Sequence, residues 1–113
     1  MTALPRLSLN QATVNRLSVN EAVDLCARHD IQAIGLWREP VAEIGLAAAA
    51  AAVRAAGLRV SSLCRGGFFT HADPAARQAA ITDNKAAIAE AAALGTGTLV
   101  LVSGGLADRK SVV

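Results

Sequence analysis

Val60-Ser61-Ser62-Leu63-Cys64-Arg65-Gly66-Gly67-Phe68-Phe69 is the stretch around which the rest of the chain is organised. The run from Arg59 to Leu63 is too short for a helix, and glycines bound it on both sides. We therefore predict a short buried strand that breaks into a glycine loop. This loop carries a cation, a thiol and two aromatic rings, so its chemistry differs from that of the rest of the chain.

The chain has only three aromatic residues, Trp37, Phe68 and Phe69, and each follows a predicted strand. A globular core normally uses such large side chains inside its helices and strands. In parallel α/β folds the loops at the carboxyl ends of the strands build the ligand site. The placement therefore indicates a ligand site, although Phe68 and Phe69 could instead only seal the end of the fold or cap a helix.

The composition restricts the class of protein. A chain of 113 residues fits one domain or part of a larger one. No run approaches the ~20 apolar residues of a membrane helix, and Met1–Leu9 lacks a secretory pattern, so we expect a cytoplasmic protein without membrane association. The net charge is only +2 and the basic residues are scattered along the sequence, which argues against nucleic-acid binding. Cys26 and Cys64 are too few for a disulfide framework or a metal knuckle.

Two helices are expected before the central stretch. Ser18 and Glu21 have the spacing of a capping box. The apolar face of the helix that follows collects Val19, Ala22, Val23, Cys26 and Ala27. Pro40 disfavours helical geometry at Glu39, so we expect a loop over 37–40 and a second helix over 43–56, ended by Gly57.

A long helix and a strand are expected after the central stretch. Asp73 is the predicted N-cap, Pro74 the first helical residue and Gly95 the stop. We expect the inward face of this helix to hold Ile81, Ile88, Ala91 and Ala92, and its solvent side to hold Asp83, Lys85 and Glu90. The strand over 98–102 is apolar almost throughout, as a strand buried on both faces should be.

The predicted elements alternate, with strands that begin near residues 7, 33, 60 and 98. Such alternation implies a parallel sheet with right-handed crossovers. Two architectures fit: an open doubly wound sheet, or the first half of an eight-stranded barrel of ~250 residues. No G-x-G-x-x-G pattern follows the first strand, which weakens the dinucleotide-binding form of the open sheet.

The C-terminal stretch 108–113 reads Asp-Arg-Lys-Ser-Val-Val. A common sequencing adapter encodes the same six residues in one frame. We therefore expect 108–113 to be a non-native scar and 1–107 to be the folded part.

The segments Ala33–Trp37, Ala56–Leu63 and Ala93–Val102, with their spacing, resemble the sugar-phosphate isomerase/epimerase group of xylose-isomerase-like TIM barrels. The resemblance implies that this chain is α/β, with the first four β/α units of a (β/α)8 barrel. It also implies a divalent metal in the intact protein, held by carboxylates and histidine from later strands, and proton transfer next to the carbonyl of a small sugar or polyol.

The expected strand ends of this chain carry few groups for that chemistry. Glu39 is the only carboxylate among them, and one carboxylate forms neither a metal cage nor an acid/base pair. We therefore expect no catalytic residue and no metal ligand in this chain alone. Cys64 is a weak alternative as a nucleophile, with His71 as its base.

Four residues are our candidates for one side of a substrate pocket: Trp37, Arg38, Arg65 and Phe68. An aromatic face packs against the C–H side of a sugar, and arginine donates to hydroxyl, carboxylate or phosphate groups. Either arginine could equally be an ordinary salt-bridge residue.

The alternative function is an inactive fragment or a weak ligand-binding half-barrel. An unclosed parallel sheet leaves unpaired edges, so this alternative predicts self-association. A nuclease acting on abasic DNA would need a basic groove, which the predicted fold does not show.

Overall fold

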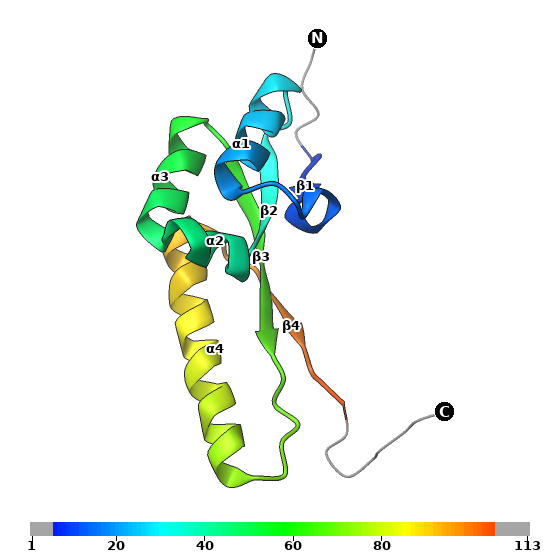
Figure 1. Cartoon of the computed structure of the whole chain (residues 1–113), viewed down its shortest axis with the longest axis vertical. Helices are drawn as coiled ribbons and strands as arrows, with labels where there is room; N and C mark the ends of the chain where they lie inside the picture. The colour runs from blue at the N-terminus through cyan, green and yellow to red at the C-terminus, as the bar shows by residue number, and fades with distance from the viewer. Residues whose placement is uncertain (1–5, 106–113) are drawn as a thin grey trace, which may run out of the picture.

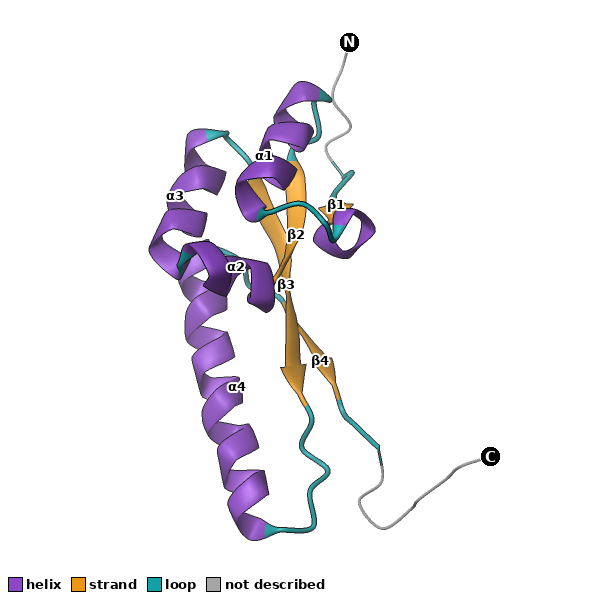
Figure 2. Ribbon diagram, viewed as in Figure 1, coloured by secondary structure: helices purple, strands orange, loops and turns teal. Residues whose placement is uncertain are grey.

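The computed structural model describes residues 6–105 and contains one parallel sheet in the order β1-β2-β3-β4. The strands are β1 (Leu9–Asn10), β2 (Ala33–Trp37), β3 (Arg59–Gly67) and β4 (Leu99–Val102). A 3-10 helix, η1 (Gln11–Val14), and the α-helices lie between them: α1 (Val19–Arg28), α2 (Arg38–Ile44), α3 (Leu46–Ala55) and α4 (Pro74–Leu94). Figures 1 and 2 show α3 and α4 side by side with β3. The expected scar at 108–113 lies outside the described residues.

The hydrophobic core lies between the helices and β2 and β3. Ile34 and Leu36 of β2 and Leu63 of β3 are completely buried. The other members of the core are Val19, Ala22, Val23, Cys26, Val41, Ala49, Ala50, Val53, Val60, Ala91 and Leu94. Four of these are alanines, which let the helices approach the sheet closely.

The structure confirms the helix boundaries that carry capping signals. The backbone N–H of Ser18 donates to Glu21 Oε1 at 3.0 Å, and the N–H of Glu21 donates to Ser18 Oγ at 3.2 Å, so the predicted capping box is present. The carboxylate of Asp73 caps α4 by accepting the N–H of Ala76 at 3.1 Å. Gly95 ends α4 with a φ of 82°.

The predicted loop over 37–40 and single helix over 43–56 are wrong. Helix α2 starts at Arg38, directly after the last residue of β2. Pro40 lies in its first turn, where a backbone N–H has no helical partner, so proline is tolerated. Gly45, with a φ of 94°, then separates α2 from α3. The predicted role of Gly57 holds, because its φ of 71° is left-handed just after the end of α3.

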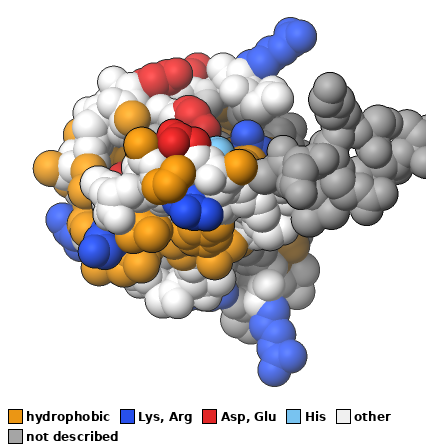
Figure 3. All heavy atoms as spheres, turned by 90° about the horizontal axis from the view of Figure 1, so that it is seen from below, with side chains coloured by type: hydrophobic (Ala, Val, Ile, Leu, Met, Phe, Trp, Pro, Cys, Tyr) orange, Lys and Arg blue, Asp and Glu red, His pale blue; other side chains and the backbone are white. Residues whose placement is uncertain are grey.

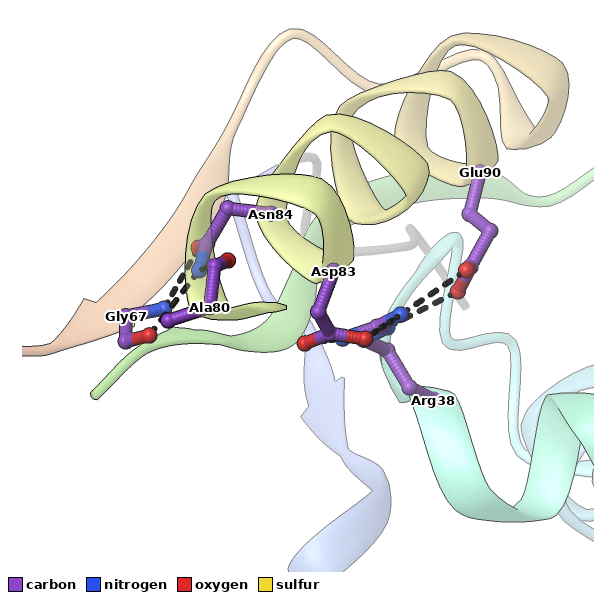
Figure 4. A network of polar contacts seen from close by, with 6 residues as sticks. All are labelled: Arg38, Gly67, Ala80, Asp83, Asn84 and Glu90. Atoms are coloured by element: carbon purple, nitrogen blue, oxygen red, sulfur yellow. Dashed lines mark hydrogen bonds and ion pairs between the residues drawn. The ribbon is translucent and has the colours of Figure 1, made fainter. Parts of the chain in front are cut away.

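Strand β3 is longer than predicted, because it includes Gly66 and Gly67. These two glycines were predicted to form a loop, but they lie in the strand, where their lack of a side chain lets Asn84 and β4 approach closely. A Cβ at Gly66 would contact Asn84 Oδ1, and a Cβ at Gly67 would contact the backbone of Val102 in β4. Asn84 of α4 is buried and accepts the N–H of Gly67 at 2.6 Å, while its Nδ2 donates to the carbonyls of Gly67 at 2.9 Å and Ala80 at 2.7 Å (Figure 4). These bonds attach the end of β3 to α4.

The predicted inward face of α4 is only partly right. Ile81 and Ile88 are 41% and 60% exposed. The residues of α4 that are buried are Asn84, Ala87, Ala91 and Leu94. Ala92 is exposed, as is Ala27 of the face predicted for α1. Short alanines therefore face the sheet, and the larger isoleucines do not.

The prediction that β4 is buried on both faces is also wrong. Val100, Leu101 and Val102 are 40%, 55% and 38% exposed. Strand β4 pairs with β3 on one side, and within residues 6–105 no strand pairs with its other side.

Candidate ligand-binding site

Three of the four predicted site residues lie together at the carboxyl end of the sheet. Trp37 is the last residue of β2, and Arg65 and Phe68 come from the end of β3 and the residue that follows it. The guanidinium carbon of Arg65 lies 5.5 Å from the centroid of the Trp37 ring and 5.3 Å from that of Phe68. Both distances fit cation–π contacts. The two rings thus hold the arginine head group at the strand ends.

Trp37 is fixed through both its ring and its backbone. Its indole Nε1–H donates to Asn10 Oδ1 at 2.8 Å. Its backbone N–H donates to Gln11 Oε1 at 2.9 Å, beyond the point where β1 stops pairing with β2. Asn10 is held in turn, because its Oδ1 also accepts the N–H of Ala12 at 2.9 Å. The last residue of β1 therefore holds the indole, and the first residue after β1 holds the backbone of Trp37.

The guanidinium of Arg65 has donors to spare. Arg65 is exposed, and within residues 6–105 its side chain makes no hydrogen bond or ion pair. A guanidinium presents five N–H donors in a planar fork that matches a carboxylate or a phosphate. Arg65 is therefore able to bind an anionic or hydroxylated group while its flat faces contact the rings.

The guanidinium of Arg38 is already paired with two carboxylates of α4 (Figure 4). Its Nε and NH2 groups donate to Glu90 at 2.9 and 3.0 Å, and its NH1 and NH2 groups donate to Asp83 at 2.9 and 3.1 Å. These bonds, led by those to Glu90, raise the pKa of Arg38, and Arg38 in turn lowers the pKa of Asp83. Arg38 therefore joins α2 to α4, and its role in substrate binding stays a prediction.

A cavity of about 460 Å³ lies next to these arginines. It is lined by Arg38, Glu39, Val41, Ala42, Leu46, Arg65, Asp83 and Glu90. Arg38 and Arg65 thus face a common space, in which Arg65 supplies the positive charge that no described carboxylate neutralises.

The structure gives no support to Cys64 as a nucleophile. Its side chain is buried, and burial raises the pKa of the Cys64 thiol, which reduces the reactive thiolate fraction. Within residues 6–105 no group of three or more His, Cys, Asp and Glu side chains is arranged to hold a metal ion. No helix in the same range is both long and apolar enough to cross a bilayer.

Sequence reasoning missed Gln11, which binds the backbone of Trp37, and Asn84, which binds the backbone of Gly67. Both are polar side chains that tertiary contacts bury, Gln11 in η1 and Asn84 in the middle of α4. No local motif marks either residue. The pairing of Arg38 with Asp83 and Glu90 was missed too, although the seven-residue spacing of these acids does place them on one face of α4.

The parallel sheet, its helices and its polar strand ends define the first part of a TIM barrel. Residues 21–112 match the family described as xylose isomerase-like TIM barrel, and the chain belongs to this family. No curated protein matches the chain.

Two solved structures resemble this one. Protein SMc04130 from Sinorhizobium meliloti 1021 is 50% identical, with a TM-score of 0.89 over 94% of this chain and 39% of that one. A xylose isomerase domain containing protein from Salmonella typhimurium LT2 is 15% identical, with a TM-score of 0.73 over 89% of this chain and 38% of that one. The chain thus spans less than half the length of both.

Proposed function

We propose that this chain supplies part of the substrate pocket of a metal-dependent sugar or sugar-phosphate isomerase or epimerase. The family includes sugar isomerases and epimerases, which supports this proposal. It is also supported by the position of Trp37, Arg65 and Phe68 near strand ends, because barrel enzymes bind substrate at the carboxyl ends of their strands. In this proposal Trp37 and Phe68 contact the C–H faces of the sugar. Arg65 donates to its anionic or hydroxyl group, and Arg38 holds α2 in position beside them.

One observation carries this proposal: Arg65 lies over Trp37 and Phe68 while its donors have no acceptor in the described part of the chain. An arginine kept only for stability would be expected to pair with a carboxylate, as Arg38 does with Asp83 and Glu90. Arg65 is instead kept in place by contacts with ring faces, which leave its N–H edge accessible to a ligand.

The residues described here do not fit a complete metal centre, since Glu39 is the only carboxylate close to the ends of β1 to β4. We propose that the metal ligands, and the groups that move the proton, belong to the part of the barrel that this chain does not span. A divalent metal would polarise the sugar carbonyl there. The free, buried thiols of Cys26 and Cys64 are compatible with a cytoplasmic location, which we also propose.

Taken alone, the chain is proposed to bind ligand weakly, without turnover, and to associate with itself. The exposed side chains of β4 and of Ile81 and Ile88 support self-association, because apolar groups beside an unpaired strand edge favour contact with another chain. Figure 3 shows apolar side chains gathered over part of the end of the molecule seen from below.

A hybrid protein tests the enzymatic proposal. Residues 7–105 replace the matching segment of SMc04130, and the hybrid is assayed against a panel of aldoses, ketoses and their phosphates with Mg²⁺, Mn²⁺ or Co²⁺. We expect metal-dependent interconversion that chelation abolishes. The substitution Arg65→Ala should lower kcat/KM roughly tenfold or more, because a charge-assisted bond is lost.

The control is Arg77→Ala, which removes an exposed arginine of α4 that lines neither the 460 Å³ cavity nor the cation–π cluster. A folded hybrid that keeps full activity after exhaustive metal removal would exclude the proposed chemistry. Equal losses for Arg65→Ala and Arg77→Ala would remove Arg65 from the site.

A further inference from the structure

The two rings that contact the guanidinium of Arg65 are held from opposite edges of the described sheet. The guanidinium carbon lies 5.5 Å from the ring centroid of Trp37 and 5.3 Å from that of Phe68. The indole of Trp37 donates to Asn10 at the end of β1, which is one edge strand. The backbone N–H of Phe68 donates at 2.6 Å to the carbonyl of Val102 in β4, the other edge strand. The place of Arg65 therefore depends on contacts with both edges.

On the β1 side, the contact is made by the side chain of Asn10. This residue is exposed, so its amide oxygen is accessible to water. The oxygen nevertheless accepts two protein donors, the indole Nε1–H of Trp37 at 2.8 Å and the backbone N–H of Ala12 at 2.9 Å. A carbonyl oxygen has two lone pairs, so both bonds form together. The bond to Ala12 caps η1 and fixes the amide, which then presents a fixed acceptor to the indole.

A fixed indole gives Arg65 a fixed ring face to rest on. Within residues 6–105 the side chain of Arg65 has no hydrogen bond or ion pair, so the ring faces are what orders its guanidinium. A long side chain that is mobile before binding loses conformational entropy when a ligand immobilises it. An arginine that the rings already order avoids part of this cost, and its affinity for an anion is higher.

We propose that Asn10 is a positioning residue for Arg65. It acts through the indole of Trp37 and contributes no donor to the ligand. We rest this inference on the proposed function in one respect, namely that Arg65 donates to an anionic group. Beyond that function, it assigns a role in ligand affinity to a residue of β1, two strands away from β3. Because Phe68 supplies the second ring, loss of Asn10 should weaken the site without abolishing it.

The affinity of the 113-residue chain for inorganic phosphate, measured by isothermal titration calorimetry at pH 7, tests this role. Arg65→Ala should remove most of the saturable binding, because the guanidinium is the donor. Asn10→Ala should weaken the affinity roughly twofold to tenfold, the loss expected when one arginine side chain must be ordered on binding. The matched control is Asn20→Ala, which removes an exposed asparagine of α1 and should leave the affinity unchanged.

A double-mutant cycle separates positioning from a general loss of structure. Trp37→Phe keeps an aromatic ring but removes the N–H that Asn10 accepts. Trp37→Phe alone should weaken the phosphate affinity, and adding Asn10→Ala should weaken it no further, because the bond between the two residues is already lost. If Asn10 mattered only as the cap of η1, Asn10→Ala would lower the affinity equally in both backgrounds.

The side-chain resonances of Arg65 in an NMR spectrum provide a second readout that needs no ligand. The ring currents of Trp37 and Phe68 should shift its Hδ and Hε protons upfield. Asn10→Ala should move these resonances toward those of a free arginine. Asn10→Asp keeps an oxygen acceptor at the same place and should retain the upfield shift. Unchanged backbone resonances of the hydrophobic core verify that each variant is folded.

The results distinguish failure of this inference from failure of the proposed function. If the chain shows no saturable phosphate binding, or if Arg65→Ala binds phosphate as tightly as the original chain, Arg65 is not the anion donor and both are overturned. If Arg65→Ala loses binding but Asn10→Ala does not, only the positioning role of Asn10 is overturned. Additive losses in the cycle, or Arg65 resonances that Asn10→Ala leaves in place, overturn that role as well.

Discussion

The substitution Asn84→Ala should destabilise the fold well beyond the loss of one small side chain. Asn84 is 6% exposed, and it pairs with both the N–H and the carbonyl of Gly67. Alanine would leave these two backbone groups without their partner in a region of low exposure. At about 1–2 kcal/mol for each unpaired group, we expect a loss of about 2–4 kcal/mol in the free energy of unfolding. The carbonyl of Ala80 adds little, because it lies within a helix and keeps its helical bond.

The loss is measured by urea denaturation followed by circular dichroism, at one fixed protein concentration. The control is Asn20→Ala on α1, which removes an exposed asparagine and should change the free energy by less than about 0.5 kcal/mol. A loss below about 1 kcal/mol for Asn84→Ala, or one equal to the control, would refute the reasoning. It would mean that water or another group satisfies the backbone of Gly67.

A double-mutant cycle with Gly66→Ala tests the geometry of the same contact. A Cβ at Gly66 would contact Asn84 Oδ1, and it would lie 3.1 Å from Leu101 Cδ2. Gly66→Ala alone should cost about 1–3 kcal/mol, the usual range for overpacking. In the Asn84→Ala background the main obstacle is gone, so the same change should cost at least about 1 kcal/mol less. Additive effects would show that Asn84 is not what excludes a side chain at Gly66.

Three further changes have defined outcomes. Arg38 holds the pKa of Asp83 below that of an unfolded aspartate, so their pairing stabilises the fold above about pH 4 and is lost as the pH falls through the folded pKa. Asp83→Asn should therefore lower the free energy of unfolding, measured by urea denaturation, by about 0.5–1 kcal/mol at pH 7 and by less at pH 3. An equal loss at both pH values would contradict this. Leu101→Lys places a charge on the exposed edge strand and should lower the weight-average mass in analytical ultracentrifugation, unless association uses another surface. Asn10→Ala removes the acceptor of the indole N–H and should shift the emission maximum of Trp37, whereas an unchanged spectrum would mean that the ring is not held as described.

The order and type of the strands and helices could be predicted because local signals mark them. Two helix starts are marked by residues that cap the free backbone N–H groups there: Ser18 with Glu21, and Asp73 with Pro74. Gly95 marks the end of α4. The start of α2 could not be predicted in the same way. The rule that proline disfavours helix at the preceding residue is weakest in the first turn, and Pro40 lies there.

Burial was harder to predict than secondary structure. Helix α4 contains so many alanines that several of its faces look equally apolar, and the size of Ile81 and Ile88 favoured the wrong one. Which face packs on the sheet depends on the pairing of Asn84 with Gly67 and of Arg38 with Glu90. These contacts join residues far apart in the sequence, and no local pattern predicts them.

The residues of the candidate site could be predicted, but which of its arginines forms ion pairs could not. The position of Trp37, Arg65 and Phe68 after strands followed from the alternation of elements, and the structure brings the three together. Arg38 is paired because Asp83 and Glu90 of α4 lie within reach of its guanidinium, whereas Arg65 makes no ion pair within residues 6–105. The role of Gln11 required the end of β1 to be known to within one residue.

The order β1-β2-β3-β4 has a consequence for how the chain reaches its fold. Every strand pairs with the strand next to it in the sequence, so no pairing has to wait for a distant segment. Each pairing still joins residues 25 to 36 positions apart, so this parallel sheet forms more slowly than a fold built from local contacts, such as a helical bundle. During synthesis, each β/α unit can nevertheless dock onto the previous one as it leaves the ribosome. The growing edge of the sheet stays open until the next strand arrives.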